Sequence, residues 1–313
     1  MTTHPRSEIM RIAFWLLLMG VALVGCSAGD EVRDTGAEAP PVRLTAETRL
    51  GQTILGLGAG QGVEVRDGKV YAYGDADTGV IVELERLPAD PSRLHPTGRV
   101  VHLTRDGEDL LPHPTGLTHH PYYGTWIGDT VDQRGTLYLI DWATAWADGN
   151  LDDAVIHVVE DDAAVNGTRP EFVEYRGRWL IATSDYDEVD NAVRLYDPER
   201  LLTARRTSED GVEVASFACT PFVQTLHWAE AADAPDTLVL VQNITPGRGW
   251  RLTPVRGWSD ARFAAAQPFD GFPHADELEG FHVLPDGETA VFITAHRHQN
   301  AWLGTASIEP VSP

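Results

Sequence analysis

The chain has 313 residues, with 24 Lys and Arg against 47 Asp and Glu, and a formal net charge of -23. A surface this acidic repels nucleic-acid phosphates and anionic lipid headgroups, which excludes nucleic-acid binding from the expected functions. The same charge either keeps the protein soluble or attracts cations and cationic ligands, and composition alone does not separate these two interpretations.

The N-terminus contains Arg6 and Arg11, a short apolar run over residues 12–25, and the sequence LVGC over residues 23–26. This order is typical of a secretory signal, and the run is shorter than the about 20 apolar residues of a membrane-spanning helix. The LVGC sequence resembles the lipobox of bacterial lipoproteins. The resemblance implies cleavage before Cys26 and a lipid on Cys26 that attaches the chain to a membrane outside the cytoplasm. Ser27 rather than Asp follows, which favours the outer membrane, on its periplasmic or surface face.

Two alternatives remain for this segment, namely an uncleaved anchor helix and a soluble secreted protein in which Cys26 is incidental. On the lipoprotein interpretation, residues 1–25 are the signal peptide, residues 26–42 are a flexible acidic linker, and residues 43–313 form one domain. Cys219 is then the only free thiol, so the mature chain has no internal disulfide, and we expect this thiol to be buried and inert.

An internal repeat predicts the fold of the domain. Five segments share a short mixed strand, a turn and an apolar strand that ends in a polar residue. Their central apolar residues recur every 54 or 55 residues, at Val63, Leu117, Phe172, Leu226 and Phe281. A third strand follows each segment, and a fourth is expected at 100–103, 155–159, 212–218 and, more faintly, near Arg262 and Phe263. The fifth unit ends with the chain, and residues 42–55 are expected to supply its missing strand.

Five four-stranded units predict an all-β fold, a five-bladed β-propeller closed by its N-terminal strand. Closure would pair the last free strand edge, which is otherwise an aggregation hazard. The alternative is a six-bladed ring, which would need an additional blade before Gly51.

In a propeller, the first strands line a central channel, and their starts meet the ends of the second strands at one rim. Second-strand ends are polar in all five units. Oxygen-rich rings suit hard cations, so these side chains predict a divalent-cation site for Ca²⁺, or alternatively Zn²⁺. The candidate metal ligands are Asp75, Asp129, Asp185, Asn243, Glu279 and His296. Because Asp and Asn also favour turns, a purely structural role is the competing interpretation.

Polar and histidine side chains on or near the first strands form a second group of candidates. They are expected to contact a ligand at the channel rim, although each histidine taken singly is more simply a core or surface residue. This group consists of Gln61, Glu64, His113, His119, Arg169, Glu171, Gln224, His227 and His282.

Three functions fit these features. The first is a propeller that binds a small-molecule, glycan or protein ligand at its rim. The second is a metal-assisted hydrolase, because Glu279-Gly280 at the start of the first strand of the last unit resembles features of propeller lactonases and phytase-like esterases. The third is a glycosidase, as several five-bladed propellers are. Such enzymes usually carry an acid on the first strand of each of the first three blades, and the second unit here has Thr115 and Thr118 instead. Fold alone does not decide between them, and no catalytic residue is assigned.

Overall fold

The computed structural model describes residues 42–189, 191–230, 237–245, 248–255, 267–269 and 277–310. All of them belong to one compact unit. The predicted signal peptide and the linker up to residue 41, Cys26 included, lie outside the described residues. Within the described ranges no helix is both long enough and apolar enough to span a membrane.

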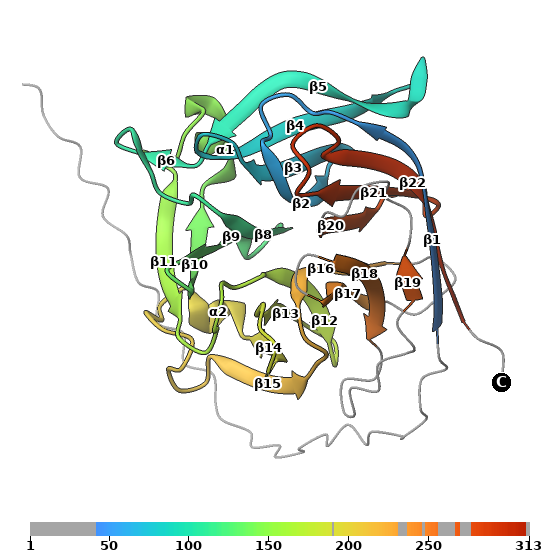
Figure 1. The fold of residues 1–313 in the computed structure, drawn as a ribbon. Coiled ribbons are helices and arrows are strands. Elements are labelled where there is room, and N and C mark those ends of the chain that lie inside the picture. Colours follow the sequence, from blue (N-terminus) through green and yellow to red (C-terminus); the bar gives the residue numbers. More distant parts are fainter. Residues whose placement is uncertain are drawn as a thin grey trace, which may run out of the picture. The chain divides into compact units, whose positions relative to one another are not determined.

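Five antiparallel four-stranded sheets are arranged round a common centre, as Figure 1 shows. Blade 1 contains β2 (Ala59–Arg66), β3 (Lys69–Asp75), β4 (Gly79–Leu87) and β5 (Asp90–His102). Blade 2 contains β8 (Pro114–His120), β9 (Gly124–Val131), β10 (Arg134–Ile140) and β11 (Val155–Asp161). Blade 3 contains β12 (Glu171–Tyr175), β13 (Arg178–Ser184), β14 (Ala192–Tyr196) and β15 (Glu213–Ala218).

Blade 4 contains β16 (Val223–Ala229), β17 (Thr237–Thr245), β18 (Arg248–Val255) and β19 (Gln267–Phe269). Blade 5 contains β20 (Leu278–Val283), β21 (Thr289–Thr294), β22 (Ala301–Pro310) and β1 (Val42–Gln52). The predicted five-bladed propeller is confirmed, and the six-bladed alternative is wrong. The weak fourth strand expected near Arg262 and Phe263 falls outside the described residues, and the strand found in that blade is β19.

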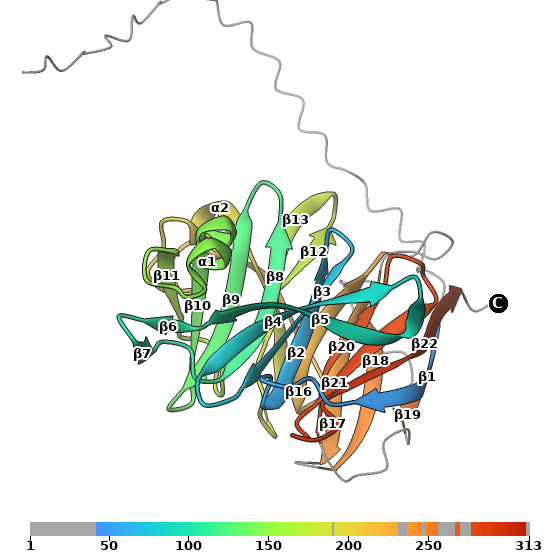
Figure 2. The same cartoon turned by 90° about the horizontal axis from the view of Figure 1, so that it is seen from above.

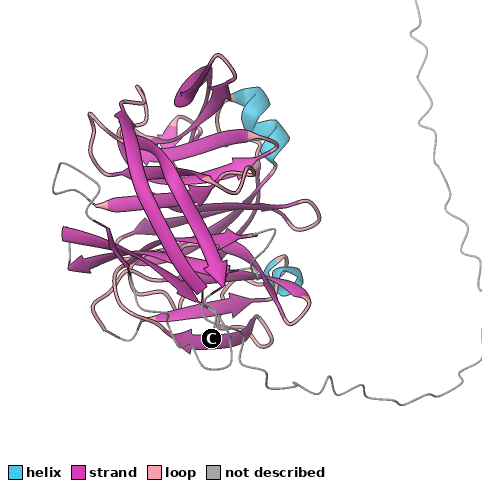
Figure 3. Ribbon diagram, turned by 90° about the vertical axis from the view of Figure 1, so that its right-hand side faces the viewer, coloured by secondary structure: helices cyan, strands magenta, loops and turns pink. Residues whose placement is uncertain are grey.

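The N-terminal strand closes the ring, as the repeat predicted. β1 pairs antiparallel with β22 along its whole length, from Val42 opposite Pro310 to Gln52 opposite Ala301. The two strands form a long pair on the outside of blade 5 (Figure 3). The side-chain amide of Gln52 also bonds the edge of β5, donating to the Leu94 carbonyl at 2.7 Å and accepting from its N–H at 3.0 Å. β1 therefore completes blade 5 by pairing with β22, and its last residue also links blade 5 to blade 1.

The hydrophobic core is divided into five clusters, one between each pair of neighbouring blades. Val63 of blade 1, for example, belongs to the same cluster as Val291 of blade 5. Each blade is therefore covered on both faces, and its middle strands are apolar at consecutive positions instead of alternating. Residues 290–293 (AVFI) are all completely buried for this reason.

Three further short elements lie in the connections. The hairpin strands β6 (Thr104–Arg105) and β7 (Glu108–Asp109) precede blade 2. Helix α1 (Trp142–Asp148) joins the third and fourth strands of blade 2, and α2 (Pro198–Leu201) does the same in blade 3. Asp141 caps α1 by accepting from the N–H groups of Ala143 and Thr144, which satisfies donors that a helix start leaves unpaired. Figure 2 shows both helices at the same side of the ring.

Candidate functional site: the polar channel and its recess

The five inner strands β2, β8, β12, β16 and β20 each leave one edge unpaired toward the channel, and unpaired backbone groups there must find other partners. For three of these backbone N–H groups, the acceptor is a side chain of the preceding blade. Thr118 Oγ1 accepts from the Phe172 N–H at 2.9 Å, Glu171 Oε1 from the Trp228 N–H at 2.7 Å, and His227 Nε2 from the Val283 N–H at 3.2 Å. These three polar residues therefore hold neighbouring blades together.

Replacing Thr118 by Val tests this assignment. The change keeps the side-chain shape and removes the acceptor of the Phe172 N–H, so we expect the free energy of unfolding to fall by about 1–3 kcal/mol. Chemical denaturation measures it. Thr45→Val, on the exposed face of β1, is the control and should change stability by less than ~0.5 kcal/mol. Equal effects for the two variants would contradict the inter-blade role.

A β-bulge recurs at the start of four inner strands. The pairing register shifts between Gly60 and Gly62, and at the corresponding places in β8, β16 and β20. A bulge leaves its extra residue unpaired and changes the direction of its side chain. The extra residues are Gln61, Thr115, Gln224 and Glu279, and all four are buried; Gln61, Gln224 and Glu279 are among the predicted candidates.

The strand-start end of the channel holds a connected polar network from blades 3, 4 and 5. The Arg169 Nε donates to the Gln224 carbonyl at 3.1 Å, and Gln224 Nε2 donates to Glu279 Oε1 at 3.1 Å. Burial, with the nearby Glu277, raises the pKa of Glu279 well above its usual value, and Arg169 only partly opposes this shift. Burial also disfavours the charged form of Arg169 and lowers its pKa to about 10.

Most of the predicted metal ligands have a protein partner, although one side-chain oxygen each of Asp75, Asp185 and Asn243 is buried without a hydrogen-bond partner among the described residues. Asp185 pairs with Arg194 at 3.0 Å, and Asp75 lies 3.5 Å from His113. Asn243 donates to Glu277 and to the Tyr186 hydroxyl, both at 3.2 Å. The His296 Nδ1 accepts from two backbone N–H groups in its own turn. Within the described ranges, no three His, Cys, Asp or Glu side chains gather so as to hold a metal ion. A cation at this rim stays a prediction.

Asp129 differs from the other five candidate ligands. Its side chain is completely buried, and neither carboxylate oxygen has a hydrogen-bond partner among the residues that the structure describes. Burial raises the pKa of Asp129 to about 7, although the nearby backbone N–H groups of Thr130 and His113 lower it.

Two further carboxyl groups lie along the channel, the half-buried Glu64 on blade 1 and the buried Glu171 on blade 3. Burial and the charge of Glu171 raise the pKa of Glu64 well above its usual value. Burial raises the pKa of Glu171 to about 8, against the N–H of Trp228 and the hydroxyl of Thr118, which lower it. Both groups therefore keep a proton to higher pH than ordinary carboxyls, because a charged form is poorly solvated there.

Two histidines face each other on blades 4 and 5. The ring centres of His227 and His282 are 4.2 Å apart. Burial lowers the pKa of His282 to about 3, and burial with His282 lowers the pKa of His227 further. Because His227 Nε2 accepts a backbone hydrogen bond, its ring is neutral with the proton on Nδ1, and Nδ1 has no partner among the described residues.

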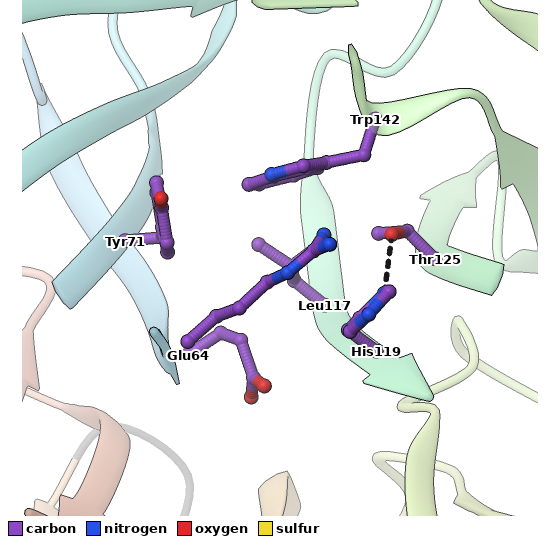
Figure 4. Close-up of a pocket in the computed structure, with 7 residues that line it drawn as sticks. Glu64, Tyr71, Leu117, His119, Thr125 and Trp142 are labelled. Carbon is purple, nitrogen blue, oxygen red and sulfur yellow. Dashed lines mark hydrogen bonds between the residues drawn. The ribbon is translucent and has the colours of Figure 1, made fainter. Parts of the chain in front are cut away.

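At the opposite end of the channel, a narrow recess with no free space for a water molecule lies between blades 1 and 2 (Figure 4). Its lining residues are Glu64, Arg66, Tyr71, Leu117, His119, Thr125 and Trp142. The Arg66 guanidinium lies over the Trp142 ring, 5.5 Å from its centre, and Tyr71 meets the same ring edge-on at 5.0 Å. His119 Nδ1 is 2.9 Å from the Thr125 hydroxyl, and burial and Arg66 lower the pKa of His119 to about 4.

Of the predicted ligand-contact residues, the recess brings together Glu64 and His119. The sequence did not predict three of its lining residues, Arg66, Tyr71 and Trp142. Trp142 enters through α1, whose signals are the Asp141 cap, the run WATAW and a closing Gly149 in the left-handed region. These signals are visible in the sequence, but only the folded blade shows that this helix lies beside the end of β2. Cys219 is half-buried instead of fully buried as expected, and burial raises its pKa to about 11.

The fold and channel define the class of protein as a five-bladed β-propeller with a polar, largely closed channel. No protein-family model and no curated protein matches the chain. Among solved structures, it is similar to the PQQ-bound aldose sugar dehydrogenase from Streptomyces coelicolor, with 12% identity, a TM-score of 0.45, and 87% of this chain and 100% of that chain covered.

Two further structures are similar. One is a GH43 glycoside hydrolase engineered for endo-xylanase and exo-arabinofuranosidase activity, with 11% identity, a TM-score of 0.47, and 86% of this chain and 52% of that chain covered. The other is the Dos1 propeller, with 12% identity, a TM-score of 0.34, and 84% and 55% covered. The chain spans about half the length of these two. Similarity at this level concerns the fold alone.

Proposed function

We propose that this protein is a lipid-anchored, extracytoplasmic propeller that binds a small polar ligand at the recess beside Glu64. The observation that carries the proposal is the distribution of hydrogen-bond partners. Thr118, Glu171 and His227 are used by the backbone of the next blade. Glu64, on the corresponding strand of blade 1, accepts no hydrogen bond from blade 2 in the described part of the chain, and it lines the recess.

The chemistry of the recess supports ligand binding. It combines a carboxyl group, a guanidinium, a neutral imidazole and two aromatic rings, which is the mixture of apolar walls and few oriented polar groups typical of ligand sites. The recess as it stands has no free space for a water molecule, far below the 300–1,000 Å³ common for drug-sized ligands, so a ligand enters only by displacing a lining side chain. The proposed ligand is therefore a small molecule or one end of a larger one.

Glu64→Gln tests the site. We expect a ligand found by thermal-shift screening of neutral, anionic and cationic small molecules to bind this variant at least ~10-fold more weakly, because a charge-assisted hydrogen bond contributes about 1.5–3 kcal/mol. Glu47→Gln, on the exposed face of β1, is the matched control. The proposal fails if no molecule in the screen binds, or if both variants bind as the wild type does.

The anchor is tested separately with Cys26→Ser. In a Gram-negative host fed a labelled fatty acid, the wild type should carry the label and sediment with membranes, whereas the variant should be unlabelled and soluble. A labelled variant, or an unlabelled wild type, would contradict the lipoprotein part of the proposal and leave the recess unaffected.

A hydrolase is the second candidate, favoured by the carboxyl pair Glu64 and Glu171. A carboxyl whose pKa is about 8 keeps its proton at neutral pH, as a general acid requires. Lactones, phosphoesters and aryl glycosides belong in the same screen for this reason. Turnover that is lost in Glu64→Gln would replace the binding function by a hydrolytic one.

A further inference from the structure

The recess beside Glu64 already contains a cation that belongs to the chain. The Arg66 guanidinium lies over the face of Trp142. It acts electrostatically on Glu64, Tyr71 and His119, since it lowers the pKa of all three. These residues come from β2, β3 and β8, so the guanidinium lies at the meeting point of three strands and α1. An aromatic face beside a carboxyl group is an environment that binds organic cations.

Arg66 is held there weakly. Its Nη1 is buried and has no hydrogen-bond partner among the described residues. In the described part of the chain its one ion pair is with Asp67, whose carboxylate lies 3.4 Å from Nε and whose side chain is 86% exposed. An ion pair with so exposed a partner contributes little to holding the side chain in place, and a buried donor without an acceptor is unfavourable.

Arg99, on strand β5, provides an internal comparison because it lies over the second tryptophan of helix α1. Its guanidinium lies 4.9 Å from the ring centre of Trp146, and it is anchored by Glu83 at 3.2 Å. Glu83 is only 4% exposed and also accepts from the Tyr71 hydroxyl. The neighbouring arginine therefore has the buried carboxylate partner that Arg66 lacks.

We propose that the recess is a binding site for a small organic cation, an alkylguanidinium or alkylammonium compound, and that Arg66 occupies it in the unliganded protein. This inference rests on the proposed function and names the ligand class for the same recess. The incoming cation would take the place of the guanidinium over Trp142, beside Glu64. The long, partly exposed Arg66 side chain sits at the end of β2, next to the Asp67-Gly68 turn, so it can leave toward solvent.

The charge of the protein is consistent with such a ligand. A formal net charge of -23 concentrates cations near the surface and speeds their association. A bound cation would also favour the ionised form of Glu64, as Arg66 does by partly opposing the rise in pKa that burial causes. Besides Arg66, the titratable groups that act on Glu64 or share the recess with it come from β3, β8 and β12, and they are Tyr71, Tyr73, His119 and Glu171.

Arg66→Ala is the decisive variant because cationic and anionic ligands predict opposite effects. Calorimetric titration at pH 8 with ethylguanidinium should show binding to Arg66→Ala at least ~10-fold tighter than to the wild type. Trp142→Leu in the same background should abolish it. Arg86→Ala, which removes an arginine paired with Asp286 outside the channel, should bind as the wild type does. Arg66→Gln is a second variant that retains more of the side-chain packing.

Two results would overturn the inference. One is acetate binding to the wild type that is lost in Arg66→Ala, which would make Arg66 the receptor of an anion. The other is a folded Arg66→Ala or Arg66→Gln that binds ethylguanidinium no better than the wild type. If the screen that tests Glu64→Gln finds a neutral or anionic ligand for the recess, the proposed ligand class is wrong and the proposed function stands. If no ligand of any charge binds the wild type or Arg66→Ala, the ligand class and the proposed function are both wrong.

Discussion

Leu44→Ala is expected to lower the free energy of unfolding by about 2–5 kcal/mol, the range for removing a buried leucine side chain. Leu44 is 1% exposed and lies on β1, opposite Ile308 of β22. It belongs to the cluster between blades 4 and 5, with Phe292 and Trp302. Because β1 joins the start of the domain to its end, weakening its packing also weakens the closure of the ring.

Leu55→Ala is the matched control for this measurement. Leu55 follows β1 by three residues and is 82% exposed, so its loss should change stability by less than ~0.5 kcal/mol. Urea denaturation followed by circular dichroism measures both variants. Similar stabilities for the two would show that β1 adds little to the closed ring.

Glu171→Gln is expected to make the protein more stable than the wild type at alkaline pH. A carboxyl whose folded pKa is raised, here to about 8, stabilises the fold fully only below its unfolded value, about 4.5. That contribution is lost as the pH rises through about 8. Glutamine keeps an oxygen to accept from the Trp228 N–H and cannot ionise. At pH 9 the variant should exceed the wild type by a few kcal/mol, since each pKa unit corresponds to about 1.4 kcal/mol.

Glu174→Gln, on the exposed face of the same strand β12, is the control and should follow the wild type at every pH. The half-buried histidines His119 and His282 act in the opposite direction. Their lowered pKa values mean that stability is lost as the pH falls below about 6.5, toward about 4 for His119 and about 3 for His282. Comparing variant and wild type at equal pH cancels this contribution. A variant no more stable than the wild type at pH 9 would mean that Glu171 is ionised and well solvated in the fold.

The candidate site was only partly predictable, and the reason lies in register. The aligned repeat treated Asp75, Asp129 and Asp185 as equivalent second-strand ends. The pairing registers place them differently: Asp129 lies opposite Pro114, Asp75 opposite Ala59, and Asp185 follows the last residue of β13. A shift of one residue turns a side chain to the other face of a sheet. Counting along the chain therefore does not show which polar residues converge.

The sequence by itself determined the blade number and the closing strand. Apolar strands recur at a fixed spacing, and a strand without a partner edge at the end of the chain requires one from the beginning. Only the tertiary structure decided which polar side chains are used by the fold and which remain available. Thr118, Glu171 and His227 bond the backbone of a neighbouring blade some 55 residues away in the sequence. Arg66 meets Trp142 only because α1 packs beside blade 1, so the recess depends on contacts between blades that no single repeat contains.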